Sequence, residues 1–252
     1  MKYDGYLICT DMDGTFCPTE ENFEAIKYFQ ENGGKFTVAT GRNINHIGEY
    51  FSEFPIAPNA PAIMCNGSVI YDYKNDEILC EHFLSPRDYE EFVKISKMYA
   101  VPVRFSQRTS APEEANVFSS DFESGKLNLD VNHMYKAVWH SIENIAPVEK
   151  HMFSNYADKY ELSKSWASLV EANPKGISKS SGTLFVKEYT KSHTLICVGD
   201  YGNDIPMLKT ADISYAVANA QENVKKAAMR ITVKNTESAI AKIIKDIGDG
   251  KC

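Results

Sequence analysis

The sequence predicts an α/β protein with a Rossmann-like parallel-sheet core, helices on both faces of that sheet, and an inserted α+β domain. Two observations lead to this prediction. Short apolar strands alternate with amphipathic helices near both ends of the 252-residue chain, as is typical of a parallel sheet. Between residues 84 and 172 the pattern changes to helices and amphipathic strands that are typical of a mixed sheet with one open face.

The first segment alternates strand and helix. Thr19 can cap a helix whose apolar face holds Phe23, Ile26 and Phe29. The elements expected here are strands at 5–10, 35–40 and 60–67, a helix from Thr19 to Gly33-Gly34, and a helix at 44–54. A hairpin with strands at 69–73 and 77–83 then leads out of the sheet.

The middle segment is expected to fold as a separate domain. Its predicted helices lie at 86–100 and 143–157, and its predicted strands lie at 101–106, 135–141, 160–166 and 168–173. The first pattern then resumes, with strands at 194–200, 213–218 and 231–233 and helices at 203–211, 222–230 and 238–247. We therefore predict a discontinuous core domain at 1–83 and 173–252, interrupted by a domain at 84–172.

Composition and charge exclude several classes of function. The formal net charge of −7 argues against a nucleic-acid binder, because phosphate backbones are held by clustered Lys and Arg. No apolar run approaches the ~20 residues of a membrane-spanning helix, and the start MKYDG lacks the pattern of a signal peptide. The six cysteines and six histidines show no CxxC, HxH or HExxH spacing, so a zinc site has little support. We expect a cytoplasmic protein, a monomer or weak homodimer, without nucleic-acid or membrane partners.

Polar residues gather where the predicted strands end, which is the edge at which parallel sheets bind ligands. In chain order they are Asp11 and Asp13, then Thr40, Gly41 and Arg42, then Asn66, and finally Asp200, Asn203 and Asp204. Four carboxylates at one edge repel each other unless a cation lies between them. An all-oxygen site of this kind suits Mg²⁺ better than a transition metal.

The two acids of the first strand need not have the same role. Asp11 can act as a nucleophile, and Asp13, two residues on, can act as general acid and base. Gly14 lets the backbone turn away, and Thr40 offers a hydroxyl to an anion. A phosphoryl group at this edge also needs a fixed cation. Lys179, at the start of a helix expected from about 180 to 190, is the preferred candidate over Lys175.

These residues resemble the motifs of a known family. DMDGT at 11–15, TGR at 40–42, Lys179 and GDYGND at 199–204 look like the four motifs of the haloacid dehalogenase superfamily of phosphohydrolases. The resemblance extends to the Cof-type subclass (IIB), whose α+β cap domain is inserted between the second and third motifs, and to the stretches at 66–72 and 216–228. The chain departs from the family at Glu237-Ser238-Ala239, where related chains often carry an acidic residue, glycine and valine.

The resemblance implies a role for each motif residue. Asp11 would form an aspartyl-phosphate, and Asp13 would protonate the leaving alcohol. Thr40 and Lys179 would hold the phosphoryl oxygens. Mg²⁺ would be bound by Asp11, the carbonyl of Asp13 and Asp200, supported by Asp204 and Asn203.

Further substrate contacts are expected from Gly41, Arg42, Asn66, Asn203 and Asn219, although each has a simpler alternative. Arg42 can pair with a neighbouring acid, Asn66 can occupy a turn that needs positive φ, and Asn219 can cap a helix. In the inserted domain, the residues that could reach a polar leaving group are Arg104, Lys136, Trp139, His140 and Trp166. Most of these are more simply explained as packing or solvent-facing residues.

The function expected from the sequence is a Mg²⁺-dependent phosphomonoester hydrolase for small phosphorylated metabolites, with sugar phosphates first. Two alternatives stay open. A phosphomutase would use the same nucleophile but return the phosphoryl group to a sugar, and a non-catalytic sensor would bind a phosphorylated ligand without turnover.

Overall fold

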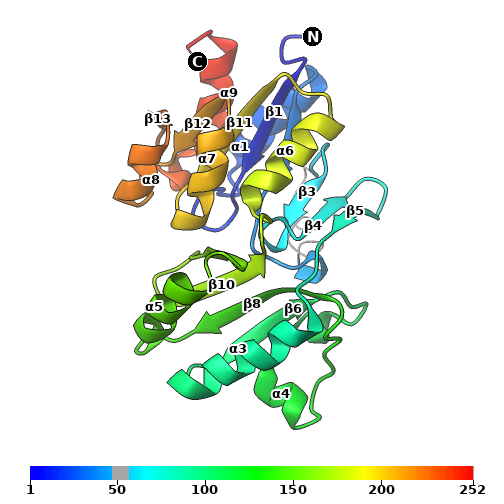
Figure 1. Ribbon diagram of the computed structural model, residues 1–252. Coiled ribbons are helices and arrows are strands. Elements are labelled where there is room, and N and C mark those ends of the chain that lie inside the picture. The colour runs from blue at the N-terminus through cyan, green and yellow to red at the C-terminus, as the bar shows by residue number, and fades with distance from the viewer. Residues whose placement is uncertain (47–56, 252) are drawn as a thin grey trace.

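The computed structural model describes residues 1–46 and 57–251. Figure 1 shows two parts: both ends of the chain form the upper part, and the middle segment forms the lower part. Each part has its own cluster of buried apolar side chains, one containing Ile8 and Ile196 and the other containing Trp139. We call the upper part the core and the lower part the cap.

The core contains a five-stranded parallel sheet in the order β13-β12-β11-β1-β2. Its strands are β1 (Tyr6–Thr10), β2 (Lys35–Val38), β11 (Thr194–Gly199), β12 (Ile213–Ala216) and β13 (Arg230–Ile231). In the register, Ile8 of β1 lies opposite Ile196 on one side and Phe36 on the other. The prediction of a parallel α/β sheet is therefore confirmed, and the first strand pairs with the strand that follows the inserted segment.

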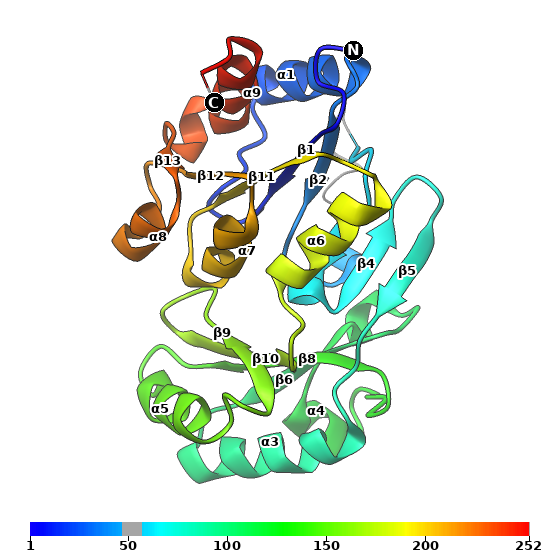
Figure 2. The same cartoon turned by 45° about the horizontal axis from the view of Figure 1, so that its top comes forward.

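Helices cover both faces of this sheet (Figure 2). On one face α1 (Glu20–Glu31) packs against α9 (Ala239–Gly248). On the other face α6 (Lys179–Tyr189) packs against α7 (Ile205–Thr210), and α8 (Glu222–Ala227) contacts α7. The Thr19 side chain accepts from Asn22 N, so the predicted cap of α1 is present. Over the described ranges, the structure contains no helix with the length and apolar character that crossing a membrane requires.

The third predicted strand differs from expectation. Only Ala62–Met64 forms a strand, β3, and it joins the parallel sheet through a single bridge from Ile63 to Ala39. It pairs mainly with the antiparallel hairpin of β4 (Val69–Asp72) and β5 (Glu77–Glu81). The strand ends early because Cys65 and Asn66 adopt left-handed conformations, with φ of 50° and 57°, that a strand cannot contain.

The helix predicted at 44–54 lies mostly outside the described residues. Ile44–His46 form a single 3₁₀ turn, η1, and residues 47–54 belong to the part of the chain that is not described. The other short 3₁₀ turns are η2 (Cys65–Gly67), η3 (Pro112–Glu114), η4 (Gly202–Asp204) and η5 (Asn235–Glu237).

The cap is built on a five-stranded antiparallel sheet in the order β7-β6-β8-β10-β9. Its strands are β6 (Val103–Gln107), β7 (Asn116–Phe118), β8 (Met134–His140), β9 (Tyr160–Ser163) and β10 (Leu169–Pro174), and its helices are α3 (Pro86–Tyr99), α4 (Ser119–Glu123) and α5 (Ile145–Asn155). The sequence patterns did not predict β7 and α4. Strand β10 also runs across the boundary predicted at 172/173.

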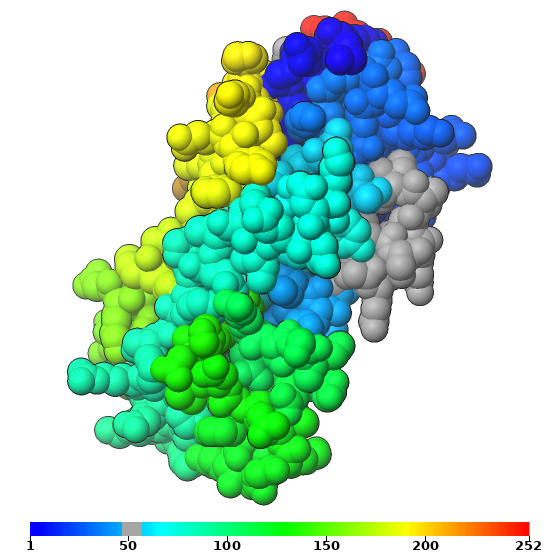
Figure 3. Space-filling model, turned by 90° about the vertical axis from the view of Figure 1, so that its right-hand side faces the viewer, coloured from blue at the N-terminus to red at the C-terminus, as the bar shows by residue number. Residues whose placement is uncertain are grey.

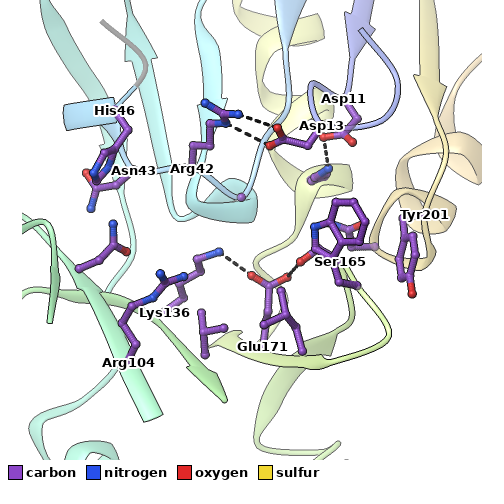
Figure 4. Close-up of a pocket in the computed structure, with 17 residues that line it drawn as sticks. Asp11, Asp13, Arg42, Asn43, His46, Arg104, Lys136, Ser165, Glu171 and Tyr201 are labelled. Carbon is purple, nitrogen blue, oxygen red and sulfur yellow. Dashed lines mark hydrogen bonds and ion pairs between the residues drawn. The ribbon is translucent and has the colours of Figure 1, made fainter. Parts of the chain in front are cut away.

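The two faces of the cap sheet have different chemistry. Alternate residues such as Phe105 and Trp139 are buried in the apolar cluster of the cap. The opposite face carries Arg104, Lys136 and Glu171, and it is turned toward the core (Figure 4). Because successive side chains along a strand point to opposite faces of the sheet, the register that buries the apolar residues also turns the polar residues toward the core.

Polar hydrogen bonds join the cap to the core. Asn43 Nδ2 of the core donates to the carbonyls of Gln107 (2.9 Å) and Ala115 (3.1 Å) of the cap. Asn173 Nδ2 of the cap donates to the Cys65 carbonyl of the core at 2.8 Å. Figure 3 shows the green cap surface lying against the blue and cyan core surface on this side of the molecule.

Candidate active site

Three carboxylates meet at the carboxyl edge of the parallel sheet. Asp11 directly follows β1, Asp200 directly follows β11, and Asp204 lies at the end of η4. One oxygen from each of them lies within 4.8 Å of the others. The residues that the sequence places at two distant strand ends are therefore neighbours in space, and their all-oxygen donor set suits a hard divalent cation.

Asp204 is held in place by the backbone that carries Asp200. Its Oδ2 accepts from the backbone N–H groups of Asp200 (2.9 Å) and Tyr201 (3.0 Å). Gly199 is needed beside it, because a Cβ there would lie 2.5 Å from the Cβ of Asp204. Thr15 Oγ1 donates to Asp200 Oδ1 at 2.6 Å. These contacts fix both carboxylates before any ligand binds.

Lys179 lies between two of the carboxylates. Its Nζ is 2.6 Å from Asp11 Oδ1 and 2.8 Å from Asp204 Oδ1, and its side chain is 1% exposed. It is the first residue of α6, which Ser178 caps by accepting from Ser181 N. Lys175, the alternative considered from the sequence, instead donates to the Ala157 carbonyl at 2.6 Å.

Burial and charge act in opposite directions on this cluster. Burial raises the pKa of the Asp11 carboxyl well above its usual range, whereas Lys179 opposes this shift. Burial also raises the pKa of Asp200, against the hydrogen bond from Thr15. For Lys179, burial alone would lower the pKa of the ammonium, but Asp11 and Asp204 outweigh it and raise the pKa. One ammonium among three carboxylates leaves an excess of negative charge that a cation would balance.

Asp13 points away from this cluster. Its carboxylate forms a two-point ion pair with Arg42, from Nη2 to Oδ1 at 2.6 Å and from Nε to Oδ2 at 3.0 Å. The side chains of Arg42 and Asp13 are 35% and 46% exposed. The simpler alternative for Arg42, a pair with a neighbouring acid, is therefore what the structure contains. The sequence predicted four carboxylates around the cation, but three cluster and the Asp13 carboxylate is not among them, because it pairs with Arg42. The predicted role of Asp13 at the metal concerned its carbonyl.

The predicted phosphate-binding residues lie at the same edge. Thr40 is fully buried, and its Oγ1 accepts from Arg42 N at 3.2 Å. Gly41 leaves room for its neighbours, because a Cβ there would lie 3.1 Å from Lys136 Nζ and 3.2 Å from Asn66 Oδ1. Asn66 is 3% exposed and has positive φ, the conformation that its simpler alternative required.

Asn203 and Asn219 differ in their position relative to the site. Asn203 is buried and lines the cavity, and within the described ranges its Oδ1 has no hydrogen-bond partner. Asn219 is exposed; its amide donates to the Gly14 carbonyl at 2.8 Å and accepts from Asn235 N at 2.9 Å. Asn219 therefore anchors the loop after Asp13 and is not among the residues that line the cavity.

A cavity of about 350 Å³ lies between the core edge and the open face of the cap sheet. Figure 4 shows Asp11, Asp13 and Arg42 on the core side, and Arg104, Lys136 and Glu171 on the cap side. The remaining lining residues are Gly41, Asn43, His46, Asn116, Val138, Ser165, Trp166, Leu169, Lys179, Tyr201 and Asn203.

A buried ion pair forms the cap wall of this cavity opposite Gly41. Lys136 Nζ lies 2.5 Å from Glu171 Oε1, with both side chains less than 5% exposed, and Ser165 Oγ donates to Glu171 Oε2 at 2.8 Å. Burial alone would raise the pKa of Glu171, but Lys136, Ser165 and Asn66 together lower it. Sequence reasoning missed Glu171 and Ser165. The sequence did offer an indication, because Leu169 and Glu171 are two residues apart on one strand and therefore lie on the same face of the sheet.

The aromatic and histidine candidates of the cap are placed differently. Trp166 lines the cavity, and its ring centroid lies 6.2 Å from that of Tyr201. Trp139 does not reach the site, because it faces the helices and packs edge-on against Phe92 with 4.9 Å between ring centroids. His140 is exposed at the end of β8 and lines an adjoining hollow instead.

Comparisons with known proteins agree with this geometry. The chain is 27% identical over 270 residues to the pyridoxal phosphate phosphatase YbhA of Escherichia coli, covering 94% of this chain and 97% of that protein. It is 24% identical over 268 residues to the 5-amino-6-(5-phospho-D-ribitylamino)uracil phosphatase YitU of Bacillus subtilis, covering 98% of both. A solved subclass IIB sugar phosphatase has the same fold, with a TM-score of 0.76, 20% identity, and coverage of 96% of this chain and 99% of that one. A family model described as haloacid dehalogenase-like hydrolase matches residues 8–244. The chain therefore belongs to the haloacid dehalogenase-like hydrolase family and is a phosphatase.

Proposed function

We propose that this phosphatase is a Mg²⁺-dependent phosphomonoester hydrolase that works through an aspartyl-phosphate on Asp11. The observation that carries the proposal is the cluster of Asp11, Asp200 and Asp204 around Lys179. A nucleophilic carboxylate attacking a phosphate dianion meets strong repulsion, which fixed cations at the site must offset.

Asp11 and Asp200 are the side chains that would hold Mg²⁺, with the Asp13 carbonyl as a further ligand and Asp204 and Asn203 in support. The excess of carboxylate over ammonium charge and the buried Oδ1 of Asn203 both fit such an ion. When bound, the ion would neutralise charge on the phosphoryl oxygens as a Lewis acid.

In the proposed reaction a carboxylate oxygen of Asp11 forms a bond to phosphorus as the ester P–O bond breaks. Asp13 donates a proton to the leaving alcohol. In the second half, Asp13 accepts a proton from the water that attacks phosphorus, and the Asp11–phosphorus bond breaks to release phosphate. Asp13 has to leave its pair with Arg42 for this role. The partial exposure of both side chains makes that separation inexpensive.

We further propose that the substrates are small phosphorylated metabolites, with sugar phosphates as the first class to test. The relatives act on a pyridoxal phosphate and on a ribitylamino-uracil phosphate, and the structural neighbour is a sugar phosphatase. A cavity of about 350 Å³ lined with charged and hydroxyl groups suits a polar molecule of this size. A cytoplasmic location and a monomeric or weakly dimeric state stay predictions.

A phosphate-release screen over a metabolite panel, with and without Mg²⁺, tests the proposal. The Asp11→Asn variant is expected to lose release, while the matched control Asp158→Asn, at an exposed cap position, is expected to keep it. If Asp11→Asn releases phosphate as fast as the parent, the assignment of Asp11 as nucleophile is wrong. If EDTA does not affect release, the proposed dependence on Mg²⁺ is wrong. Recovery of an isomerised sugar phosphate without free phosphate would identify a mutase, and binding without turnover would identify a sensor.

A further inference from the structure

Within the described part of the chain, Arg104 forms no ion pair, whereas Arg42, Lys136 and Lys179, which line the same cavity, each pair with a carboxylate. Lys179 pairs with Asp11 and Asp204, Arg42 with Asp13, and Lys136 with Glu171. Within residues 1–46 and 57–251, Arg104 has neither a hydrogen bond nor an ion pair from its side chain. Its guanidinium is half-buried and lines the cavity from β6. Arginine stays charged in such a setting, so this charge is available to a ligand.

Burial lowers the pKa of Arg104 and the charge of Glu171 opposes that shift, but within the described residues Glu171 forms no ion pair with Arg104. Glu171 faces the same cavity, but both of its oxygens are occupied, Oε1 by Lys136 at 2.5 Å and Oε2 by Ser165 at 2.8 Å. The Lys136–Glu171 pair is already neutral as a unit. Among the residues that the structure describes, Arg104 is therefore a cavity-lining cation on the cap side that forms no ion pair.

A second hydrogen-bond donor lies on the neighbouring strand. Asn116 lines the cavity from β7, two residues before the partner of Arg104 in the β6–β7 register. Its Oδ1 accepts from Ser106 Oγ at 2.5 Å, which leaves its NH₂ group as a donor; no hydrogen bond uses that group within the described ranges. A guanidinium and an amide NH₂ on adjacent strands form a donor set that matches a carboxylate or phosphate.

We propose that Arg104, with Asn116, binds a second anionic group of the substrate, at the end remote from the phosphoryl group that is cleaved. Figure 4 shows Arg104 on the cap side, across the cavity from Asp11 and Asp13. A substrate whose phosphoryl group lies at Asp11 would thus extend its other end toward the cap sheet. The preferred substrates are phosphomonoesters that also carry a carboxylate or a second phosphate. This inference rests on the proposed hydrolase function, because it assigns the leaving-group end of the same site.

Matched pairs of sugar derivatives test the proposal. Sorbitol 6-phosphate and 6-phosphogluconate differ in a hydroxymethyl group against a carboxylate at the far end. Fructose 6-phosphate and fructose 1,6-bisphosphate provide the phosphate arm. For the parent enzyme, kcat/KM is expected to be higher for the anionic member of at least one pair, and the pair that shows it tells which anion the site takes.

The Arg104→Gln variant is expected to lower this anionic-to-neutral ratio by about 10- to 100-fold, the range for loss of a charged hydrogen bond. Arg104→Lys is expected to restore part of it. The matched control Arg87→Gln removes the same charge from an exposed position of the cap and is expected to leave the ratio unchanged. An unchanged ratio in Arg104→Gln, or an equal fall in Arg87→Gln, overturns the proposal.

Equilibrium binding separates this result from failure of the proposed function. In the Asp11→Asn background, calorimetry is expected to show tighter binding of 6-phosphogluconate, or of fructose 1,6-bisphosphate, than of its neutral partner. Adding Arg104→Gln is expected to remove that difference. Equal binding of both members in both pairs overturns the role of Arg104 even if phosphate is released. If Asp11→Asn releases phosphate as fast as the parent while the binding difference is intact, the hydrolase mechanism alone is overturned.

Discussion

Replacing Lys179 with methionine tests whether this one ammonium group compensates the charge of the buried carboxylate cluster. Lys179 is 1% exposed and contacts Asp11 at 2.6 Å and Asp204 at 2.8 Å, whose side chains are 8% and 0% exposed. Lys179→Met keeps the apolar length but leaves two buried carboxylates without their cation. Breaking a buried pair in this way costs about 3–5 kcal/mol.

The expected readout is the melting temperature measured in the absence of divalent cations. A loss of 1 kcal/mol lowers Tm by about 2–4 °C for a chain of ~150–250 residues, so Lys179→Met is expected to melt about 6–20 °C below the parent. Phosphatase activity is expected to fall by about 100-fold or more, since a fixed charge at the reacting phosphoryl group is lost.

The matched control lies on the same helix. Lys187 pairs with Asp212 at the same 2.6 Å, but the two side chains are 25% and 45% exposed. Lys187→Met is therefore expected to cost no more than about 1 kcal/mol. The double variant Lys179→Met/Asp204→Asn is expected to recover part of the stability, because one of the unpaired charges is removed. If Lys179→Met melted within 2 °C of the parent, or no lower than Lys187→Met, the account of the cluster would be refuted.

Two further predictions concern the loop after the nucleophile and the acid stability of the cap. Gly14 has φ of +90°, and a Cβ there would clash with the Asp200 carboxylate. Gly14→Ala is therefore expected to lower kcat/KM by about 100-fold through misplacement of that carboxylate. The control Gly125→Ala, also at positive φ but in open space, is expected to leave kcat/KM unchanged, and equal effects of the two variants would contradict the steric reasoning. Burial alone would raise the pKa of Asp88, but hydrogen bonds from Tyr160 and other donors hold that pKa below its ordinary value. Because the folded pKa is the lower one, this stabilisation is present above the ordinary pKa of about 3.9 and is lost as pH falls through the folded pKa. Urea midpoints of parent and Asp88→Asn are therefore expected to differ at pH 7 and to converge toward pH 3, and a constant difference would refute this assignment.

The carboxylate cluster could be predicted because it follows from topology. Parallel strands all end at one edge, so acids that directly follow two such strands, Asp11 and Asp200, must lie close together. The helix expected from about 180 to 190 placed Lys179 at its start, and α6 begins at Lys179. These inferences needed only the order of elements along the chain.

The cap contacts could not be predicted in the same way. Lys136 and Trp139 lie on one strand but on opposite faces of the sheet. The strand sequence alone does not say which of these faces the helices cover. The structure places Trp139 under the helices and Lys136 toward the core. The early end of β3 was also hidden, because positive φ at Cys65 gives no signal in its residue type.

The junction between cap and core has a consequence for substrate access. It includes amide-to-carbonyl hydrogen bonds from Asn43 and Asn173, and water can replace such bonds at a net cost of about 0.5–1.5 kcal/mol each. The ion pair of Arg108 with Glu81, at 3.0 Å, also joins the two parts. Most of each apolar cluster lies inside its own part, but Tyr135 of β8 is fully buried in the cluster of the core and stacks on Phe83, with 5.2 Å between ring centroids. A cap movement that keeps Tyr135 seated in the core would break bonds such as those of Asn43 and leave both apolar interiors covered. The energy needed to admit a metabolite by such a movement would be small compared with the energy that keeps each part folded.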